Sequence, residues 1–525
     1  MAQVPDGALM QRAAAGLASV CASLLGAGSG GVYGAEVVVF AGTGDNGGDA
    51  LYAAARLAGR GAQVTAVQAG RGIHAGGASA LKDKGGRIVL VTPPRGPDDT
   101  RPDVPARYDA GHDVRHAIGH ADLIIDGMLG IGGKGGLREP YATLAQLAAT
   151  AAATTVAVDL PSGIDADTGA VEGPAVRADV TVTFGAIKPG LLIDPGASHA
   201  GVTELVDIGL APHLENTPDV SAPQRDDVRA LLPRPDNESD KYRRGVLGLL
   251  AGSDRFTGAA LLATGGAVHG GAGMVRLVTA PAAAAAARQA WPEVVITELA
   301  GETRVRSGEE LEPSPPDDGK PLFPEDVGRV QAWVAGPGMG TTDAAAARLA
   351  AILATSLPVL VDADGLSLLA RNSGLLPRPA PTLLTPHAGE LGRLLGADPA
   401  DVAARRLEHA RRAAAEFGAC VLLKGSTTVV APPDGREPVL VNTTGTPWLA
   451  TAGTGDVLAG LAGALLAQGM LPPQAAIAAA YLHGLAARLA AAGGGGWDWG
   501  DADAGEAPIG ASDVVRGLPL AFRAL

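Results

Sequence analysis

The stretch TAGTGDVLAG, residues 451–460, decides the fold of the second half of the chain. A turn containing Gly453 and Gly455 brings one carboxylate, Asp456, into the start of an apolar run that predicts a helix. Glycines let backbone N–H groups approach an anion closely, and the N-terminus of a helix carries partial positive charge. An acidic side chain at this place is either a base for a substrate hydroxyl beside bound phosphates or an ordinary helix cap. The rest of the chain has to distinguish these two interpretations.

The composition indicates the class of protein. The chain has 525 residues, too many for one core, since soluble domains commonly contain ~100–200 residues. Hydrophobic residues make up 47% but aromatic residues only 3%, so the cores must consist of small aliphatic side chains. The formal net charge of −14 argues against binding to nucleic acid or to an acidic membrane, although glycine-loop amides can still bind phosphate. We therefore expect two large α/β domains.

The cysteines and the N-terminal segment bear on localisation. Cys21 and Cys420 lie far apart without metal-ligand spacing, which is typical of reduced, buried thiols. The apolar N-terminal segment has no basic region before it, and Gln11 and Arg12 interrupt it. We therefore expect the first helix of a globular domain rather than a signal peptide. No run reaches the ~20 uninterrupted apolar residues that cross a bilayer, so we expect a cytoplasmic protein without a membrane partner.

Short apolar runs alternate with Ala-rich segments in the first half, which predicts a parallel sheet covered by helices on both faces. Ligands bind at the carboxyl ends of the strands in such sheets, so the loops after the strands are the place for a site. Three loops are unusual: GTGDNGGD (42–49), DGMLGIGGKGG (126–136) and DLPSGID (159–165). Oxygens of Asn and Asp in the first loop suit a hard cation or a hydroxyl-bearing ligand. The second loop either wraps a phosphate, with Lys134 as charge partner, or is a surface linker. The expected strands are Glu36–Phe40, Gln63–Val67, Arg87–Val91, Asp122–Ile125, Thr155–Val158 and Val180–Phe184.

These loops, with VDLPSGIDADTG (158–169) and TFGAIKPG (183–190), resemble the N-terminal epimerase domain of the NAD(P)H-hydrate repair enzymes over most of residues 8–210. The resemblance implies a Rossmann-like three-layer αβα domain that interconverts the R and S epimers of hydrated NAD(P)H. The family usually has Asn where this chain has Asp45, and Gly where it has Ala50. Asp45 adds a negative charge near a phosphate-bearing ligand, so a domain that only binds nucleotide remains an alternative.

The same resemblance assigns roles to individual residues. Asn46, Asp126 and Ser162 would hold a potassium ion. Asp159 would transfer a proton, with Lys188 as a second polar group. The residues that would contact the hydrated nucleotide are Asp45, Asn46, Gly47, Gly48, Asp49, Gly130, Ile131, Gly132, Gly133, Lys134, Gly135, Gly136 and Asp159.

A polar, Pro-containing segment around residues 211–231 separates the two halves, and we place the domains at 1–213 and 222–525. Polar loops again follow apolar runs in the second half, and each taken alone has a structural explanation. His387 can be a core histidine, and Lys424 a solvated strand end. The charged, Pro-rich segment 302–325 predicts an exposed insertion. Together the loops predict a site near Asp456; they are LAGS…FTGAA (250–260), GPGMG (336–340), DADG (362–365), TPHAGE (385–390), KGSTT (424–428) and NTTG (442–445).

This order of motifs resembles the ribokinase-like superfamily, and more closely the ADP-dependent NAD(P)H-hydrate dehydratases, across most of residues 225–520. The resemblance implies a ribokinase-like αβα domain. Asp456 would take the proton of the C6 hydroxyl, which attacks the terminal phosphoryl of ADP or ATP held with Mg²⁺; the phosphate ester then leaves as the nicotinamide ring is restored. The nucleotide contacts would be Lys424, Gly425, Ser426, Thr427, Thr428 and Gly455. The contacts to the hydrated cofactor would be Ala260 (or its neighbour Ala259), Gly338, His387 and Asp456.

The sequence therefore predicts a bifunctional repair enzyme that acts on NADHX or NADPHX with ADP and gives AMP and phosphate. We expect a homo-oligomer without a nucleic-acid partner. A small-molecule kinase, for example one that phosphorylates a vitamin precursor, remains an alternative because it would share the base and the nucleotide loop.

Overall fold

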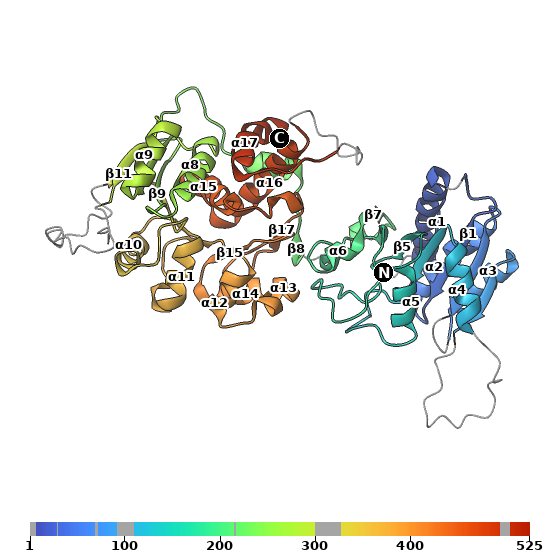
Figure 1. The fold of residues 1–525 in the computed structure, drawn as a ribbon. Helices are drawn as coiled ribbons and strands as arrows, with labels where there is room; N and C mark the ends of the chain where they lie inside the picture. Colours follow the sequence, from blue (N-terminus) through green and yellow to red (C-terminus); the bar gives the residue numbers. More distant parts are fainter. Residues whose placement is uncertain are drawn as a thin grey trace, which may run out of the picture. The chain divides into compact units, whose positions relative to one another are not determined.

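The computed structural model describes residues 7–28, 30–68, 72–91, 110–214, 217–299, 327–493 and 505–525. The chain forms two compact units, Met1–Thr217 and Pro218–Leu525, each with its own sheet and its own hydrophobic core (Figure 1). The insertion predicted at 302–325 lies outside the described residues.

The first unit is built on a seven-stranded parallel sheet, as the alternation of apolar runs and helices predicts. Its central strands are buried along almost their whole length, which explains why they consist of Val, Ile, Leu, Ala and Phe. Each predicted strand is present, and the sequence missed only the edge strand β7. In order across the sheet the strands are β3 (Arg87–Leu90), β2 (Gln63–Gln68), β1 (Glu36–Ala41), β4 (Leu123–Gly127), β5 (Thr154–Val158), β6 (Val180–Phe184) and β7 (Val202–Val206).

Helices cover both faces of this sheet. The core on one face contains residues of α1 (Ala8–Gly28), α2 (Asp45–Ala58) and α3 (Ala75–Asp83), and the core on the other face contains residues of α4 (Ala110–His120) and α5 (Tyr141–Ala148). Shorter helical segments are η1 (Pro189–Leu191), α6 (Ala197–Ala200) and η2 (Ala211–His213).

The N-terminal helix differs from expectation in one respect. Among the described residues, α1 is the one helix long and apolar enough to cross a membrane by length and composition, whereas the sequence reading found no such run. One side of α1 is buried in the core of the first unit, with Leu17 and Cys21 fully covered. Cys21 and Cys420 are both free and buried, as predicted, and burial raises the pKa of the Cys21 thiol to about 12.

The second unit contains a ten-stranded sheet that is parallel except where β16 pairs with its two neighbours β15 and β17. The runs predicted to be strands before the polar loops are β9, β12, β13, β14 and β15. Local pattern did not reveal the strands at the two ends of the sheet. The order is β11 (Val295–Glu298), β10 (Met274–Thr279), β9 (Val246–Leu250), β12 (Ala332–Ala335), β13 (Val359–Val361), β14 (Thr382–Leu384), β15 (Cys420–Leu423), β16 (Thr428–Ala431), β17 (Val439–Asn442) and β8 (Val220–Ser221).

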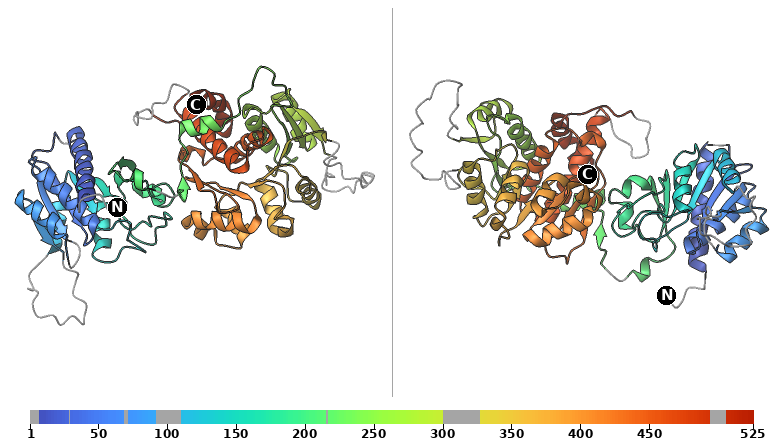
Figure 2. Two further views of the ribbon diagram at one scale, coloured as in Figure 1. Left: turned by 180° about the vertical axis from the view of Figure 1, so that it is seen from behind. Right: turned by 60° about the horizontal axis from the view of Figure 1, so that its bottom comes forward.

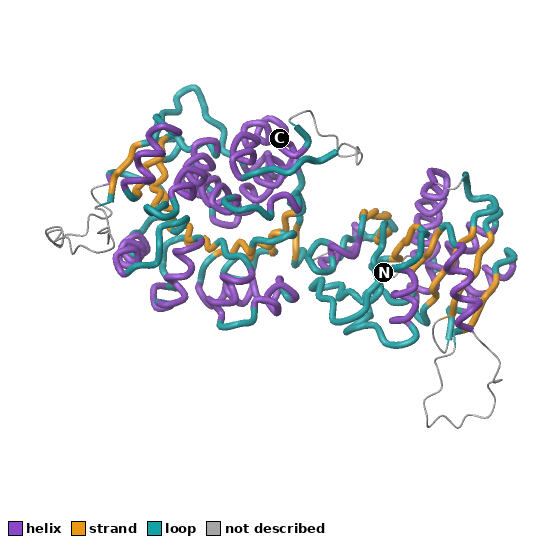
Figure 3. The backbone as a smooth tube through the Cα atoms, viewed as in Figure 1, coloured by secondary structure: helices purple, strands orange, loops and turns teal. Residues whose placement is uncertain are grey.

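Figure 2 and Figure 3 show this sheet as a layer between two groups of helices. One face carries α8 (Thr257–His269), α15 (Thr454–Ala467), α16 (Pro472–Ala491) and α17 (Ala511–Ala524). The other face carries α10 (Asp343–Leu353), α11 (Ala363–Arg371), α12 (Ala388–Leu395), α13 (Pro399–Ala404) and α14 (Arg406–Phe417). The remaining helical segments are α7 (Arg225–Leu231), α9 (Pro281–Ala290), η4 (Ser373–Leu375) and η5 (Pro447–Leu449).

Helix α15, which begins in the opening motif, is fixed by close packing against α8. A Cβ on Gly460 would lie 1.9 Å from the carbonyl oxygen of Ala263, and a Cβ on Gly266 would lie 2.1 Å from that of Val457. Only glycine allows the two backbones to approach this closely. The glycines within these apolar helices therefore place the first turn of α15, with Asp456, at the carboxyl edge of the sheet.

Candidate active sites

In the second unit, a lysine and several carboxylates meet where β13, β14 and β15 end. Lys424 follows β15, and its Nζ lies 2.6 Å from Oδ1 of Asp362, the residue after β13. The same Nζ lies 3.8 Å from Oε2 of Glu390, in the first turn of α12. Burial lowers the pKa of Lys424, but the charges of Asp362 and Glu390 outweigh this effect and hold the pKa above its usual value. The ammonium group is therefore a fixed positive charge.

Asp456 lies at the same place, in the first turn of α15, where Gly453 adopts φ +92° as the helix cap. Burial, and next the charge of Asp362, raise the pKa of Asp456 to about 7, and Lys424 only partly offsets this rise. A carboxylate whose pKa lies near neutrality is well suited to accept a proton from a hydroxyl. Asp456 therefore has the properties of a general base, and no side-chain cap hydrogen bond is formed at the start of α15.

A cavity of about 450 Å³ lies beside this base. One side is polar, and the other is formed by small apolar residues such as Leu449, Ala450, Leu458 and Ala480. Of the predicted nucleotide contacts, Lys424, Gly425, Ser426, Thr428 and Gly455 line it. A Cβ on Gly455 would lie 3.4 Å from Nζ of Lys424, so the lysine sits over the first turn of α15. The structure therefore brings five of the six predicted contacts together at the edge of one cavity.

Thr427 is the sixth predicted contact, and its part in nucleotide binding stays a prediction. Its side chain is buried, it is absent from the cavity lining, and its carbonyl oxygen accepts a hydrogen bond from Arg406. The buried Arg406 also donates through Nη2 to the carbonyl oxygen of Lys424, at 2.8 Å. Residue 427 thus helps to hold the loop that carries the lysine and turns away from the cavity.

Helix α16 contributes His483 to the lining of the cavity and Arg488 to the support of one of its loops. His483 lines it and lies 2.9 Å from the carbonyl oxygen of Thr454 through Nε2. Burial lowers the pKa of His483 to about 4, so the ring is neutral and, because a carbonyl only accepts, Nε2 carries the proton. Arg488 donates to the carbonyl oxygens of Thr444 and Gly445, at 2.7 and 2.6 Å, and fixes that loop.

The residues predicted to contact the second ligand lie at the neighbouring strand ends. Gly338 adopts φ +59°, and a Cβ there would lie 2.7 Å from the Cβ of Ala259. Ala260 is fully buried, and a Cβ on Gly252 would lie 2.7 Å from its Cβ, whereas Ala259 is the residue of the pair that lies next to Gly338. His387 is exposed at the start of α12, where Nδ1 accepts hydrogen bonds from two backbone N–H groups. It is a helix cap whose Nε2 lies 3.6 Å from Oε1 of Glu390, not a core histidine.

In the first unit, Asp126 and Ser162 form a buried pair at the carboxyl ends of β4 and β5. Ser162 donates through Oγ to Oδ1 of Asp126, at 2.7 Å, and through its backbone N–H to Oδ2, at 2.8 Å. Burial raises the pKa of Asp126 to about 6, against the effect of these hydrogen bonds. Asn46 is close by, since a Cβ on Gly130 would lie 3.2 Å from its Cγ, and Nδ2 of Asn46 is buried without a hydrogen-bond partner.

Asp159 directly follows β5 and has φ +66°, a strained conformation for a residue other than glycine. Its Oδ1 pairs with Nζ of Lys188 and accepts hydrogen bonds from Thr183 Oγ1 and Phe184 N, each at 3.2 Å. Side chains of Asp159 and Lys188 are only 13% and 16% exposed, so the pair is largely shielded from solvent. From the sequence, Lys188 was expected only as a second polar group beside Asp159. In the structure the two side chains form an ion pair.

The glycine loops of the first unit differ in how they meet the predictions. Gly47 is required, because a Cβ there would lie 2.3 Å from the carbonyl oxygen of Gly42. Lys134, predicted as a free charge partner for phosphate, instead pairs with Asp165 and Asp167, at 2.9 and 3.0 Å. Its charge is therefore already partly compensated. Within the described ranges, no group of three or more His, Cys, Asp or Glu side chains has the geometry of a metal site.

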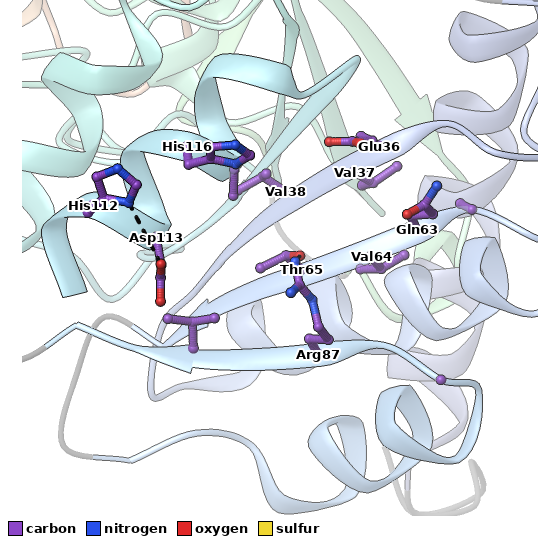
Figure 4. A pocket seen from close by; sticks show the side chains of 14 residues that line it. Glu36, Val37, Val38, Gln63, Val64, Thr65, Arg87, His112, Asp113 and His116 are labelled. Atoms are coloured by element: carbon purple, nitrogen blue, oxygen red, sulfur yellow. Dashed lines mark hydrogen bonds and ion pairs between the residues drawn. The ribbon is translucent and has the colours of Figure 1, made fainter. Parts of the chain in front are cut away.

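A larger cavity of the first unit, about 740 Å³, contains none of the predicted site residues (Figure 4). It lies over the amino-terminal halves of β1 and β2, next to α4, and its polar lining includes Thr65, Arg87, His112 and His116. Ligands of parallel α/β sheets bind at the opposite, carboxyl edge. We therefore place the site of this unit at Asp126, Asp159 and Ser162.

Comparison with known proteins identifies the families of both units. Residues 6–190 match the family described as YjeF-related protein N-terminus, and residues 247–496 match the family described as NAD(P)H-hydrate dehydratase. The bifunctional NAD(P)H-hydrate repair enzyme Nnr of Mycobacterium leprae is 42% identical over 527 residues, covering 100% of this chain and 96% of that protein. The chain belongs to the family of bifunctional NAD(P)H-hydrate repair enzymes. The Nnr protein of Mycobacterium tuberculosis is 44% identical, covering 91% of this chain and 88% of that protein.

A solved structure is also similar to the second unit of this family member. It is the ADP/ATP-dependent NAD(P)H-hydrate dehydratase from Bacillus subtilis, co-crystallised with ATP and Mg²⁺, which is 30% identical, covers 59% of this chain and 99% of its own, and has a TM-score of 0.46.

The sequence reading gave no role to several residues that shape the two sites. Asp362 and Glu390 belong to the motifs DADG (362–365) and TPHAGE (385–390). The position of these motifs directly after predicted strands could have identified both residues as site residues. Arg406 and His483 lie within helices and, along the sequence, outside the glycine-rich motifs. A single histidine in the Ala-rich helix α16 was a weak signal, and Arg406 gave none.

Proposed function

We propose that residues 1–213 interconvert the R and S epimers of NADHX or NADPHX, and that residues 222–525 convert the S epimer to NADH or NADPH with ADP, giving AMP and phosphate. The observation that carries this proposal is the position of Asp456, a half-buried carboxylate with a pKa of about 7, directly after Gly455, which lines a 450 Å³ cavity together with the glycine loop of Lys424. Family membership over the full chain supports both activities.

In the second unit, the geometry supports phosphoryl transfer to the substrate. Asp456 accepts the proton of the C6 hydroxyl, and the oxygen attacks the terminal phosphoryl of ADP. Lys424 and the backbone N–H groups at the start of α15 stabilise the charge that develops on the phosphoryl oxygens. The phosphate ester is a much better leaving group than hydroxide, so the ring nitrogen expels it and the nicotinamide ring is restored.

The carboxylates around the lysine fit a cation that accompanies the nucleotide. Four carboxylates interact electrostatically around this one lysine, so negative charge is in excess at this edge of the sheet. They are Asp362, Asp364, Glu390 and Asp456. Oxygen-rich surroundings of this kind suit Mg²⁺, which is commonly bound by one or two carboxylates together with phosphates. When bound, the ion would neutralise the phosphates of ADP or ATP.

In the first unit, Asn46, Asp126 and Ser162 supply a carboxylate, a hydroxyl and an amide within a small volume. The carboxylate, hydroxyl and amide oxygens are donors of the type that hard cations prefer. We propose these residues as the potassium site. Asp159, with Lys188, accepts or returns the proton at the C6 hydroxyl.

Incubation of the purified protein with separate R and S epimers tests the proposal, with and without ADP, while the absorbance of the reduced nicotinamide and the release of phosphate are measured. We expect S epimer plus ADP to give NAD(P)H, AMP and phosphate, and R epimer to react only after conversion to S. A stable phosphorylated product without restored absorbance would indicate a small-molecule kinase instead. Asp456→Asn should lose dehydration but keep epimerisation, whereas Asp159→Asn should lose use of the R epimer alone.

A further inference from the structure

A second carboxyl group faces Asp159 from helix α2. This helix packs against β4 and β5 as well as β1, so its first turns lie over the carboxyl ends of the central strands. The close approach depends on Gly127 at the end of β4, where a Cβ would lie 2.5 Å from the Cβ of Ala50 and 3.2 Å from the carbonyl oxygen of Asn46. Asp49 lies in this segment, between Asn46 and Ala50, and is close enough to Asp159, the residue after β5, for the two charges to interact.

The two carboxyl groups have opposite surroundings. Asp159 is paired with Lys188 and accepts further hydrogen bonds from Thr183 and the Phe184 N–H, and every one of these donors binds Oδ1. Asp159 is therefore held by an ion pair and two further hydrogen bonds. Asp49 has no such support, because its Oδ1 is buried without a hydrogen-bond partner. Burial, then the charge of Asp159, then that of Asp45, raise the pKa of Asp49 to about 7.

Neither feature is explained by the stability of the fold. A buried carboxyl oxygen without a partner costs free energy, and so does a non-glycine residue at positive φ. Both occur at the same edge of the sheet, in the loops proposed to bind the hydrated nucleotide. Two carboxyl groups of which one is ionised and one protonated form the usual acid and base pair of enzymes that work at neutral pH.

We propose that Asp49 is the second catalytic residue of the epimerase site, giving a proton to the C6 hydroxyl while Asp159 accepts the proton of the water that returns. This inference rests on the proposed function of the first unit. Asp49 gives its proton to the hydroxyl, and the C6–O bond breaks with its electron pair on oxygen. Water leaves as the N1 lone pair forms a C6=N1 double bond. Water then adds to the opposite face of C6, its proton passes to Asp159, and the electrons return to N1.

The reverse reaction starts from the state that this sequence leaves, with Asp159 protonated and Asp49 ionised. The same two groups therefore serve both directions, and proton exchange with solvent restores the starting state. The residues whose charges act on Asp49 are Asp45 and Asp159, the latter paired with Lys188. The charge of Asp45 favours the protonated form of Asp49.

The test measures kcat, KM and the pH profile of R-epimer conversion in the full chain, with water enriched in ¹⁸O as solvent. The wild-type protein should introduce ¹⁸O at C6. Asp49→Asn should lower kcat by a factor of about 10²–10⁴ with a smaller change in KM, while S-epimer dehydration stays intact. Asp113→Asn, an exposed carboxylate on α4, is the matched control and should change neither activity. Asp45→Asn should move the loss of activity at high pH to lower pH, because a negative charge that raises the Asp49 pKa is removed.

Wild-type kcat in Asp49→Asn, or epimerisation without ¹⁸O in the product, would overturn the role of Asp49 and leave the proposed function standing. Absence of any epimerisation by the wild-type protein would instead overturn the proposed function. If Asp49→Asn and Asp49→Ala both unfold, the Asp45→Asn profile decides, and an unmoved high-pH limb refutes the inference.

Discussion

The pH dependence of the dehydration reaction is the sharpest prediction from the second unit. Asp456 acts as a base only when it is ionised, and its pKa of about 7 lies far above the usual value of 3.8. About one tenth of the protein is then active at pH 6 and about nine tenths at pH 8, so kcat should rise roughly tenfold across this range. An ordinary aspartate would give a flat profile over the same interval.

Asp362→Asn should move this rise to lower pH. Asp362 is the charged group that contributes most to the raised pKa of Asp456, and it also pairs with Lys424. Removal of its charge ends the repulsion and frees the lysine to compensate Asp456, so both consequences lower the Asp456 pKa. The variant leaves the burial of Asp456 unchanged, so its pKa should not fall all the way from about 7 to the usual value of 3.8. We expect the midpoint of the pH profile to move down by about one pH unit.

The assay starts from purified S epimer with saturating ADP and follows the absorbance of the reduced nicotinamide, after subtraction of the uncatalysed reaction at each pH. Asp434→Asn, an exposed turn residue of the same unit, serves as the control and should leave the profile in place. Thermal unfolding of each variant separates a shift in titration from a loss of folded protein. A wild-type rate that falls as the pH rises, or an Asp362→Asn profile displaced to higher pH, would refute the assignment of Asp456 as base.

Three further perturbations follow from the structure. Arg406→Met removes the donors to the carbonyl oxygens of Lys424 and Thr427. It should lower the free energy of unfolding by on the order of 3 kcal/mol, measured by urea unfolding, and weaken ADP binding, measured by calorimetry. Unchanged ADP affinity would contradict the role of Arg406 in holding the loop. Gly336→Ala should destabilise by about 2–4 kcal/mol, because the new Cβ would lie 1.8 Å from the carbonyl oxygen of Asp362 at φ +139°, whereas Gly340→Ala, with open space around it, should cost only about 1 kcal/mol. Replacement of potassium by sodium should slow epimerisation and leave dehydration unchanged, and equal effects on both rates would argue against a potassium site at Asn46, Asp126 and Ser162.

Periodicity and loop chemistry in the sequence were sufficient for the fold class and for most of the site. Continuous apolar runs are required of strands buried on both faces, so β1, β4 and β5 were visible as sequence patterns. The glycines before Asp456 were equally visible, because their freedom of φ is a local property. Edge strands such as β7, β11 and β8 were not, since they are short and owe their place to pairing with distant segments.

What the sequence alone determined is which residues can do chemistry: the loops after the strands, the base at Asp456 and the lysine at 424. Only the tertiary structure decided how their charges act on one another. The pKa of Asp456 depends on Asp362, and that of Asp49 depends on Asp159, in each case across more than ninety residues of chain. The physical reason is that desolvation and Coulomb interactions depend on distance and burial in space, which no local pattern encodes.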